Sequence, residues 1–281
     1  ARTDANFAAG ILDHCCTFPV PTNGTGNIIA DPQLVDFTHI NPASPCVAQG
    51  SPSTGTDIDG QSWNAVPSIG CDEPLEAISS ESLSIFLTSS CPGAATNVSI
   101  LFTARVSGHA TSNIWDFGDG QFATNLVFAN HAFSHAGTFI VSVRAFNDSN
   151  PDGVLSSTAV TIADDPVQYV AIGNPSPTPP YLTWETAATN IQDAIDHGFA
   201  GGTILVSSGV YQTGGRALFS DLTNRVVVDR PVTLRSVNGP VATTIVGFSA
   251  VPSGTSSNAI RGIYLCDGAT LDGFTIMNGA T

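Results

Sequence analysis

Trp115-Asp116-Phe117-Gly118-Asp119-Gly120 is the stretch that decides the fold in the middle of this 281-residue chain. An aromatic strand runs here into a Gly-Asp-Gly turn, which is typical of a β-hairpin. One β-rich run precedes the stretch at residues 98–106, and a second run at residues 138–146 alternates apolar and polar side chains. The pattern predicts an all-β region around the hairpin.

Three motifs in a fixed order give this region a resemblance to a known family. The hairpin stretch is followed by His131-Ala132-Phe133 and then by the strand GTFIVSVRAFN at residues 137–147. In this order they resemble the polycystic-kidney-disease-type (PKD) domain, an immunoglobulin-like β-sandwich, over residues 76–165. The resemblance implies an extracellular spacer or a weak glycan- or protein-contacting module, with Trp115 and Phe117 in its core.

The chain has a different pattern from Tyr169 onward. Apolar residues within 183–196 fall on one helical stripe, with Thr183 as the N-cap and Gly198 just past the end, which predicts one short helix near residues 184–196. Short β runs separated by Gly, Asn or Asp turns follow, and their spacing favours a solenoid over a βαβ sheet. These runs lie at residues 203–206, 226–228, 232–234, 244–246, 263–265 and 271–276.

A second resemblance covers both ends of the chain. The helix ATNIQDAID and the later runs GGTILVSSGVY, RPVTLRSVNGP and GATLDGFTIMNG resemble the beginning of a pectate-lyase-like right-handed parallel β-helix, in which the helix plugs the open N-terminal end. The Pro- and Gly-rich residues 1–75 resemble the tail that folds over the last coils of bacterial β-helix repeat proteins. The predicted fold is therefore all-β: a C-terminal-type β-helix end segment at 1–75, a PKD-like sandwich at 76–165, and a β-helix start at 166–281.

This order leaves the last predicted strand without a coil to stack on. A β-helix coil satisfies its strand edges only against another coil. The chain is then one repeat of a tandem array, a fragment lacking further coils, or a molecule that stacks on the tail of the next copy. We expect an extracellular structural or adhesive protein that partners with itself in a head-to-tail filament or surface array. The candidate interface residues are Leu271, Phe274 and Ile276.

Charge excludes several other functions. The eight basic residues are all arginines and stand against 23 acidic ones, so the net charge is -15. Nucleic acids and anionic membrane surfaces would be repelled, and without lysine neither Schiff-base chemistry nor a P-loop is expected. No apolar stretch is long enough for membrane insertion. The first residues lack a signal-peptide pattern, so we expect either a removed leader or an excerpt of a longer chain.

Two alternatives to a structural role remain open. A glycan-binding module would stack sugars on exposed aromatic residues such as Trp63 or Tyr181. A polysaccharide lyase fragment would need acidic residues paired with each other or with an arginine at catalytic separation. The candidates near strand ends offer no such pair, so no catalytic residue is assigned and no enzyme or cofactor is expected; they are Asp229, Arg230, Arg235, Asp267 and Asp272.

Calcium is the one ion that the sequence offers sites for. Weak candidate ligands are Asp116 and Asp119 in the hairpin turn, and Asp57 and Asp59 in a second Asp-x-Asp-Gly turn. Both stretches lack the later ligands of a calcium loop, which favours a turn-forming role. The six histidines are scattered along the chain and predict no cluster.

The six cysteines contain no CxxC pair, which argues against a zinc knuckle. An even count in an acidic, lysine-free chain favours an oxidising, extracellular or cell-surface setting, with buried free thiols as the alternative. A bridge between Cys46 and Cys71 would close a local loop, and an intermolecular bond between Cys266 and Cys15 or Cys16 is an alternative. Spacing alone selects no pairing; the candidates are Cys15, Cys16, Cys46, Cys71, Cys91 and Cys266.

Overall fold

The computed structural model describes residues 10–74, 82–218, 222–249 and 259–280. Strands dominate, and one short α-helix is present among these residues, as the sequence predicts. The chain divides into two compact units. The first contains Ala1–Thr88, Phe102–Ala129 and Ile140–Thr158, and the second contains Ser89–Leu101, Asn130–Phe139 and Ala159–Thr281.

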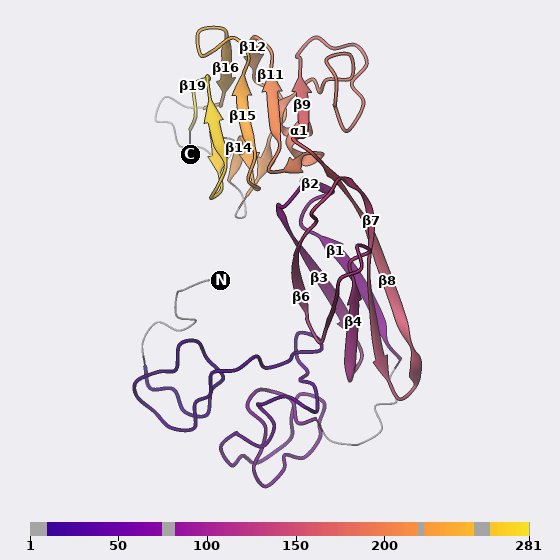
Figure 1. The fold of residues 1–281 in the computed structure, drawn as a ribbon. Helices are drawn as coiled ribbons and strands as arrows, with labels where there is room; N and C mark the ends of the chain where they lie inside the picture. Colours follow the sequence, from indigo (N-terminus) through magenta and orange to yellow (C-terminus); the bar gives the residue numbers. More distant parts are fainter. Residues whose placement is uncertain (1–9, 75–81, 219–221, 250–258, 281) are drawn as a thin grey trace. The chain divides into compact units, whose positions relative to one another are not determined.

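The predicted hairpin lies in a β-sandwich (Figure 1). One sheet has the order β1-β3-β6 and the other β10-β2-β8-β7-β4-β5. The strands are β1 (Ser84–Ser89), β2 (Gly93–Ala95), β3 (Ser99–Ser107), β4 (Ser112–Asp116), β5 (Phe122–Thr124), β6 (Phe128–Ala132), β7 (Gly137–Asn147), β8 (Asn150–Ala163) and β10 (Phe199–Ala200).

The hairpin motif supplies the sandwich with core residues and a tight turn. Trp115 is fully buried, pairs with Val143 across β4 and β7, and donates its indole N–H to the carbonyl of Leu126 at 2.9 Å. Phe117 stacks beside Trp115 and is also buried. Gly118 has a φ of +78°, and a Cβ there would lie 2.7 Å from the carbonyl oxygen of Ile140. The predicted core role of both aromatic residues is confirmed.

The region after residue 166 consists mainly of parallel strands stacked in register, with the short β13 antiparallel to β14. One sheet has the order β18-β15-β11-β9, the next β12-β16-β19, and the third β13-β14-β17. Thr203 pairs with Thr233, which pairs in turn with Thr270. The strands are β9 (Val167–Val170), β11 (Thr203–Val206), β12 (Gly209–Tyr211), β13 (Arg216–Ala217), β14 (Thr223–Val228), β15 (Thr233–Ser236), β16 (Thr243–Val246), β17 (Ile260–Leu265), β18 (Thr270–Asp272) and β19 (Thr275–Met277).

We call these successive layers coil 1 (β11, β12, β14), coil 2 (β15, β16, β17) and coil 3 (β18, β19). Neighbouring strands β9, β11 and β15 lie side by side in Figure 1. The core between the sheets is apolar, and its members are fully or nearly buried. They include Val170, Ile204, Val206, Tyr211, Val226, Val228, Leu234 and Ile245.

The helix α1 (Ile191–Asp196) is shorter than predicted. The Asn190 side chain accepts a hydrogen bond from the backbone N–H of Asp193, so Asn190 is the N-cap, and the predicted cap at Thr183 is wrong. The backbone of Ala188 is used elsewhere, since it pairs with β9 through Val170. The segment before Asn190 therefore extends the sheet instead of the helix.

Two glutamine amides connect α1 to the strands. The Gln192 side chain accepts from the N–H of Val227 at 2.7 Å and donates to the Val227 carbonyl at 3.2 Å. The Gln168 amide donates to the Pro180 carbonyl at 2.8 Å and to the His197 carbonyl at 3.1 Å. Both glutamines are buried. The Gln192 amide bonds to the backbone of β14 as a neighbouring strand would. The Gln168 amide joins the segments that precede and follow α1.

Residues 10–74 have no named strand, and only short bridges order their backbone. Cys16 and Ile28 form a parallel bridge, and Leu34 and Ile40 form an antiparallel one. Carboxylates that accept backbone N–H groups supply much of the remaining order, a common substitute for ladder bonds in loops. These carboxylates belong to Asp13, Asp31, Asp36, Asp57, Asp72 and Glu73.

Candidate functional site

Four side chains of the first unit converge into one cluster: His39, Asp59, Asp72 and His109. Each offers a ligand atom, and these atoms all lie within 4.8 Å of one another. Three come from residues 10–74 and one from the loop between β3 and β4. We call this group the His–Asp cluster.

A tight turn at residues 36–39 positions His39. The Asp36 carboxylate accepts the backbone N–H groups of Thr38 at 2.8 Å and His39 at 2.9 Å, and flanking backbone bonds join Val35 to His39. Asp36 Oδ2 also contacts His39 Nδ1 at 2.5 Å. This contact leaves His39 Nε2 facing Asp59, whose Oδ2 lies 3.1 Å away.

The two carboxylates change the protonation of this histidine. Burial by itself would lower the pKa of His39, but hydrogen bonds and charge from Asp36 and Asp59 outweigh it and raise the pKa to about 9. The pKa of Asp36 shifts the other way: burial would raise it, but the bonds from His39 and Thr38 hold it below its usual value.

Asp59 joins the two histidines. Asp57 accepts the backbone N–H of Asp59 at 3.0 Å and that of Gln61 at 2.8 Å, which fixes the turn. Asp59 Oδ2 then lies 3.4 Å from Nδ1 of His109. The rings of His39 and His109 stack with centroids 4.4 Å apart and planes 13° from parallel.

Asp72 is the most deeply buried member, with 1% of its surface exposed. Its Oδ2 accepts the backbone N–H of Ile40 at 2.9 Å. The other oxygen, Oδ1, has no hydrogen-bond partner among the residues that the structure describes. Burial raises the pKa of Asp72, although the N–H of Ile40 and the nearby histidines oppose the shift.

The predicted calcium ligands fall in different places. Asp116 accepts the N–H of Gly118 and Asp119 accepts that of Gln121, so both shape the hairpin turn. The Asp57 carboxylate accepts hydrogen bonds from backbone N–H groups, whereas Asp59 is part of the His–Asp cluster. No local sequence signal marks His39, Asp72 or His109, and the prediction that the scattered histidines form no cluster is wrong, because His39 and His109 both belong to this one.

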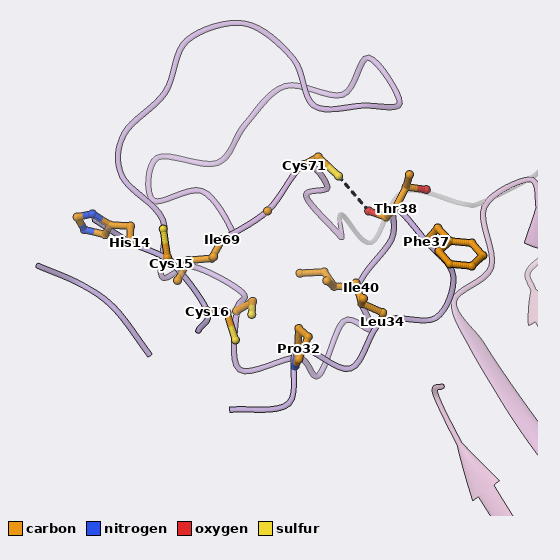
Figure 2. A pocket seen from close by; sticks show the side chains of 12 residues that line it. His14, Cys15, Cys16, Pro32, Leu34, Phe37, Thr38, Ile40, Ile69 and Cys71 are labelled. Atoms are coloured by element: carbon orange, nitrogen blue, oxygen red, sulfur yellow. Dashed lines mark hydrogen bonds between the residues drawn. The ribbon is translucent and has the colours of Figure 1, made fainter. Parts of the chain in front are cut away.

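A largely apolar cavity of about 380 Å³ lies beside this region (Figure 2). Cys15, Cys16, Cys46 and Cys71 all line it. In Figure 2 the thiol of Cys71 donates to the carbonyl of Thr38, at 3.3 Å. All six cysteines of the chain, each within the described residues, are free thiols, so the predicted Cys46–Cys71 bridge is absent from the structure.

The thiols of Cys16 and Cys46 interact. Burial raises the pKa of the Cys46 thiol to about 11, and a hydrogen bond with Cys16 contributes to the shift. Cys16 Sγ also contacts the carbonyl of Ala30 at 3.2 Å. Cys91 is buried and Cys266 is half-buried.

Four of the five residues considered for lyase chemistry are engaged in ion pairs. Asp229 contacts Arg230 at 3.0 Å and also pairs with Arg216. Arg235 pairs with Asp272 at 2.9 Å across coils 2 and 3, and both side chains are more than half exposed.

The two aromatic residues considered for sugar stacking differ in exposure. Tyr181 is only 6% exposed and belongs to the core beneath α1, so its predicted exposure is wrong. Trp63 is half-buried and lines a polar hollow of about 240 Å³ together with Asp13, Ser51 and Ser53.

The three residues predicted to form an assembly interface also differ in how exposed their side chains are. Leu271 and Phe274 are partly buried and pack against the coil core. Ile276 is 43% exposed, next to Met277 at 46%.

Comparison with known proteins identifies the sandwich. Residues 85–160 match the PKD domain family, which confirms the immunoglobulin-like class expected for the middle of the chain. No curated protein matches the chain. The parallel strands after residue 166 match no identified β-helix family among these comparisons.

Several solved structures are similar to part of the chain. The PKD1 domain of Vibrio anguillarum Epp is 16% identical, with a TM-score of 0.26, over 30% of this chain and 98% of that one. The PKD domain of human VPS10 domain-containing receptor SorCS2 is 21% identical, with a TM-score of 0.26, over 41% and 94%. A structure from work on carbohydrate-binding modules of the β-sandwich superfamily is 16% identical, with a TM-score of 0.29, over 35% and 39%.

The part of the chain that the structure describes contains no helix with the length and apolar character that a bilayer crossing needs. PKD domains typically occur in extracellular or cell-surface proteins, which agrees with the setting expected from the composition.

Proposed function

We propose that this chain is a structural unit of an extracellular protein, and that its parallel coils continue from one unit to the next in a head-to-tail filament or array. The observation that supports the proposal best is the outer edge of the coils. Within the described residues, β17, β18 and β19 each stand last in their sheet. We call these three strands the open edge.

The open edge combines two features that favour pairing. An edge strand presents unpaired backbone N–H and C=O groups, which serve as a template for a strand of another chain. Exposed apolar side chains accompany these groups: Leu265 is 39% exposed, Ile276 43% and Met277 46%. Charged residues, which commonly protect exposed edges, are few here, with Asp272 of β18 engaged by Arg235.

The partner that we propose is residues 10–40 of a second copy. The parallel bridge between Cys16 and Ile28 gives this segment a short coil of its own. Apolar side chains along it are exposed, including Ile11 at 72%, Phe18 at 49% and Ile29 at 54%. Stacking would cover apolar surface on both copies, which is the main favourable contribution to association.

Sedimentation velocity over a range of protein concentrations tests the proposal. We expect the wild-type chain to self-associate, and Ile276→Glu to weaken the association by about tenfold or more, because a buried charge without a partner is costly. Ile29→Glu should have the same effect from the other side. Val241→Glu is the matched control, because Val241 is fully exposed in a turn of the same unit.

Two outcomes would contradict the proposal. One is a wild-type chain that stays monomeric at the highest concentration. The other is association that Ile276→Glu leaves unchanged while its circular dichroism spectrum matches the wild type. Negative-stain images of the associated wild type should contain linear particles, whereas closed compact dimers would argue against a filament.

We further propose that Cys16 and Cys46 form a disulfide in an oxidising compartment. Glutathione disulfide would accept one hydrogen from each thiol, so that one Sγ–Sγ bond forms and two glutathione molecules leave. The hydrogen bond between the two thiols supports this pairing. Peptide mapping after oxidation should recover a peptide linking Cys16 to Cys46, and recovery of Cys46 linked to Cys71 would contradict it.

Glycan binding is a second candidate function, favoured by the polar hollow beside Trp63. An indole face with hydroxyl and carboxylate groups around it has the composition of a sugar-binding site. A glycan array should then give signals that Trp63→Ala abolishes. Trp184→Ala provides the control, because Trp184 is 41% exposed and lies outside the hollow.

A further inference from the structure

We propose that the His–Asp cluster binds one divalent transition-metal ion of the zinc type. Two imidazoles and two carboxylates form a ligand set that suits Zn²⁺, which takes four nitrogen, oxygen or sulfur ligands. Calcium prefers oxygen ligands alone, and six to eight of them, so the two histidines argue against it. The ligand atoms already lie within 4.8 Å of one another.

The orphaned oxygen of Asp72 points to a ligand independently of this ligand set. A buried carboxylate oxygen normally has a hydrogen-bond partner, because leaving it without one is costly. Oδ1 of Asp72 has none among the described residues, although the residue is 1% exposed. A metal ion in the cluster would satisfy this oxygen.

The surrounding residues orient the ligands as a metal site requires. Metal-binding histidines usually donate their other ring N–H to a carboxylate, which fixes the ring and the tautomer. Asp36 occupies this position on His39, with Oδ2 at 2.5 Å from Nδ1. His39 Nε2 is thereby presented to the cluster, next to Asp59. Asp57 fixes the backbone of Asp59 by accepting its N–H, and the Ile40 N–H donates to Oδ2 of Asp72.

Such an ion would have a structural role. Its ligands come from the turn at residues 36–39, the turn at residues 57–61, Asp72, and the loop that carries His109. All of these belong to the first unit, where residues 10–74 have no named strand. The ion would fasten these loops to the β3–β4 loop by ligand bonds in place of ladder hydrogen bonds.

Calorimetric titration of the full chain with Zn²⁺, after removal of any affinity tag and treatment with a chelator, tests the site. We expect one ion per chain and a higher melting temperature with zinc than without it. His109→Ala and Asp72→Asn should each weaken zinc affinity by about tenfold or more, and Asp36→Asn by about 10- to 100-fold. His135→Ala and Asp148→Asn are matched controls at exposed positions and should bind as the wild type does.

The nearby thiols need a separate control, because cysteine also binds zinc. X-ray absorption of the wild-type zinc complex should give only nitrogen and oxygen neighbours at about 2.0–2.2 Å, with imidazole scattering. Cys16→Ser with Cys46→Ser should leave the zinc affinity unchanged. This spectroscopic measurement also tests the site if His109→Ala fails to fold.

The proposal would be overturned by sulfur neighbours around the zinc, by wild-type affinity in both folded ligand variants, or by a chain that binds no zinc. Binding of calcium but not zinc would also overturn it. If the chain binds neither ion, the four side chains form a hydrogen-bonded ion network only.

Discussion

Buried carboxylates determine the local structure of residues 10–74, and Glu73 is the clearest example. It is completely buried, and its oxygens accept from the Asn64 amide at 2.8 Å, the Ser68 N–H at 2.8 Å and the Ser68 hydroxyl at 3.1 Å. Glu73 therefore accepts hydrogen bonds from three donors in a region where no strand supplies acceptors for them.

We expect Glu73→Gln to destabilise the chain by about 1–3 kcal/mol, since the new amide group cannot accept where a carboxylate oxygen did. Urea denaturation followed by tryptophan fluorescence would measure the loss, with Glu185→Gln as the control at an exposed carboxylate. An unchanged unfolding midpoint would show that water satisfies these donors.

At the level of single residues, sequence reasoning succeeded where neighbours in the chain determine the role. The turn-forming roles of Asp116 and Asp119 follow from the glycines beside them. His39 and His109 are seventy positions apart, and no local pattern indicates that their rings stack. Their proximity depends on the packing of loops, which hydrophobic periodicity does not describe.

Secondary-structure elements also depend on contacts with residues that are distant in the sequence, as α1 illustrates. The Gln192 amide makes two hydrogen bonds to Val227 of β14. Gln192→Ala would leave the buried N–H of Val227 without a partner, so we expect a loss of about 1–3 kcal/mol. Thermal unfolding would measure it, and Gln121→Ala in an exposed turn is the control. Equal stability of the two variants would contradict the strand-like role of the amide.

Arg216 contacts both Asp229 and Asp196, the last residue of α1, and this ion network makes the stability of the second unit sensitive to acid. Burial alone would raise the pKa of Asp229, but hydrogen bonds from Arg216 and Arg230 hold it below the ordinary 3.8. Ionised Asp229 therefore stabilises the fold above this pH, and the contribution disappears as the pH falls from 3.8 through the lower pKa of the folded state.

Asp229→Asn should accordingly lower the melting temperature at pH 7 by an amount worth on the order of 1 kcal/mol, because the side chain is partly exposed. The difference from the wild type should vanish in strong acid. Asp272→Asn, whose side chain is 55% exposed, should have little effect at either pH. A difference that persists in strong acid would assign the effect to packing instead of charge.

The sequence predicted the strands of the coils well and the start of the helix poorly. The strands begin and end near Gly, Asn and Asp turns, which are local signals. The apolar stripe that predicted a helix from Thr183 is real, but Ala188 bonds to β9 before the helix begins. That pairing joins residues that are 18 positions apart, so no capping rule could identify it.

For the whole molecule, net charge opposes contact between copies. At -15 the chains repel one another, and this repulsion is screened within about 10 Å at 0.1 M salt. We expect self-association through the open edge to strengthen as sodium chloride is raised from about 0.01 to 0.5 M, as the screening length falls. Sedimentation velocity across this range would measure it, and association that weakens with salt would indicate an ionic interface instead.

The sequence also indicated the sandwich and the parallel strands, but it could not supply the spatial order of the sheets. Hairpin signals and alternation are sufficient for a β-sandwich, whereas parallel pairing joins residues 30 or more positions apart, as Thr203 and Thr233 are. The loops of residues 10–74 lack periodicity altogether, and their structure depends on carboxylates whose roles only the fold reveals.

The glutamine amides around α1 give the coils a polarity. At Val227 the Gln192 amide occupies both the N–H and the C=O of β14, so an incoming strand finds no free donor or acceptor there. On the opposite side this sheet ends in β17 of the open edge. In a head-to-tail fibre of such units, one tip would present the open edge and the other tip residues 10–40, so the two tips would differ in the rate at which subunits join and leave.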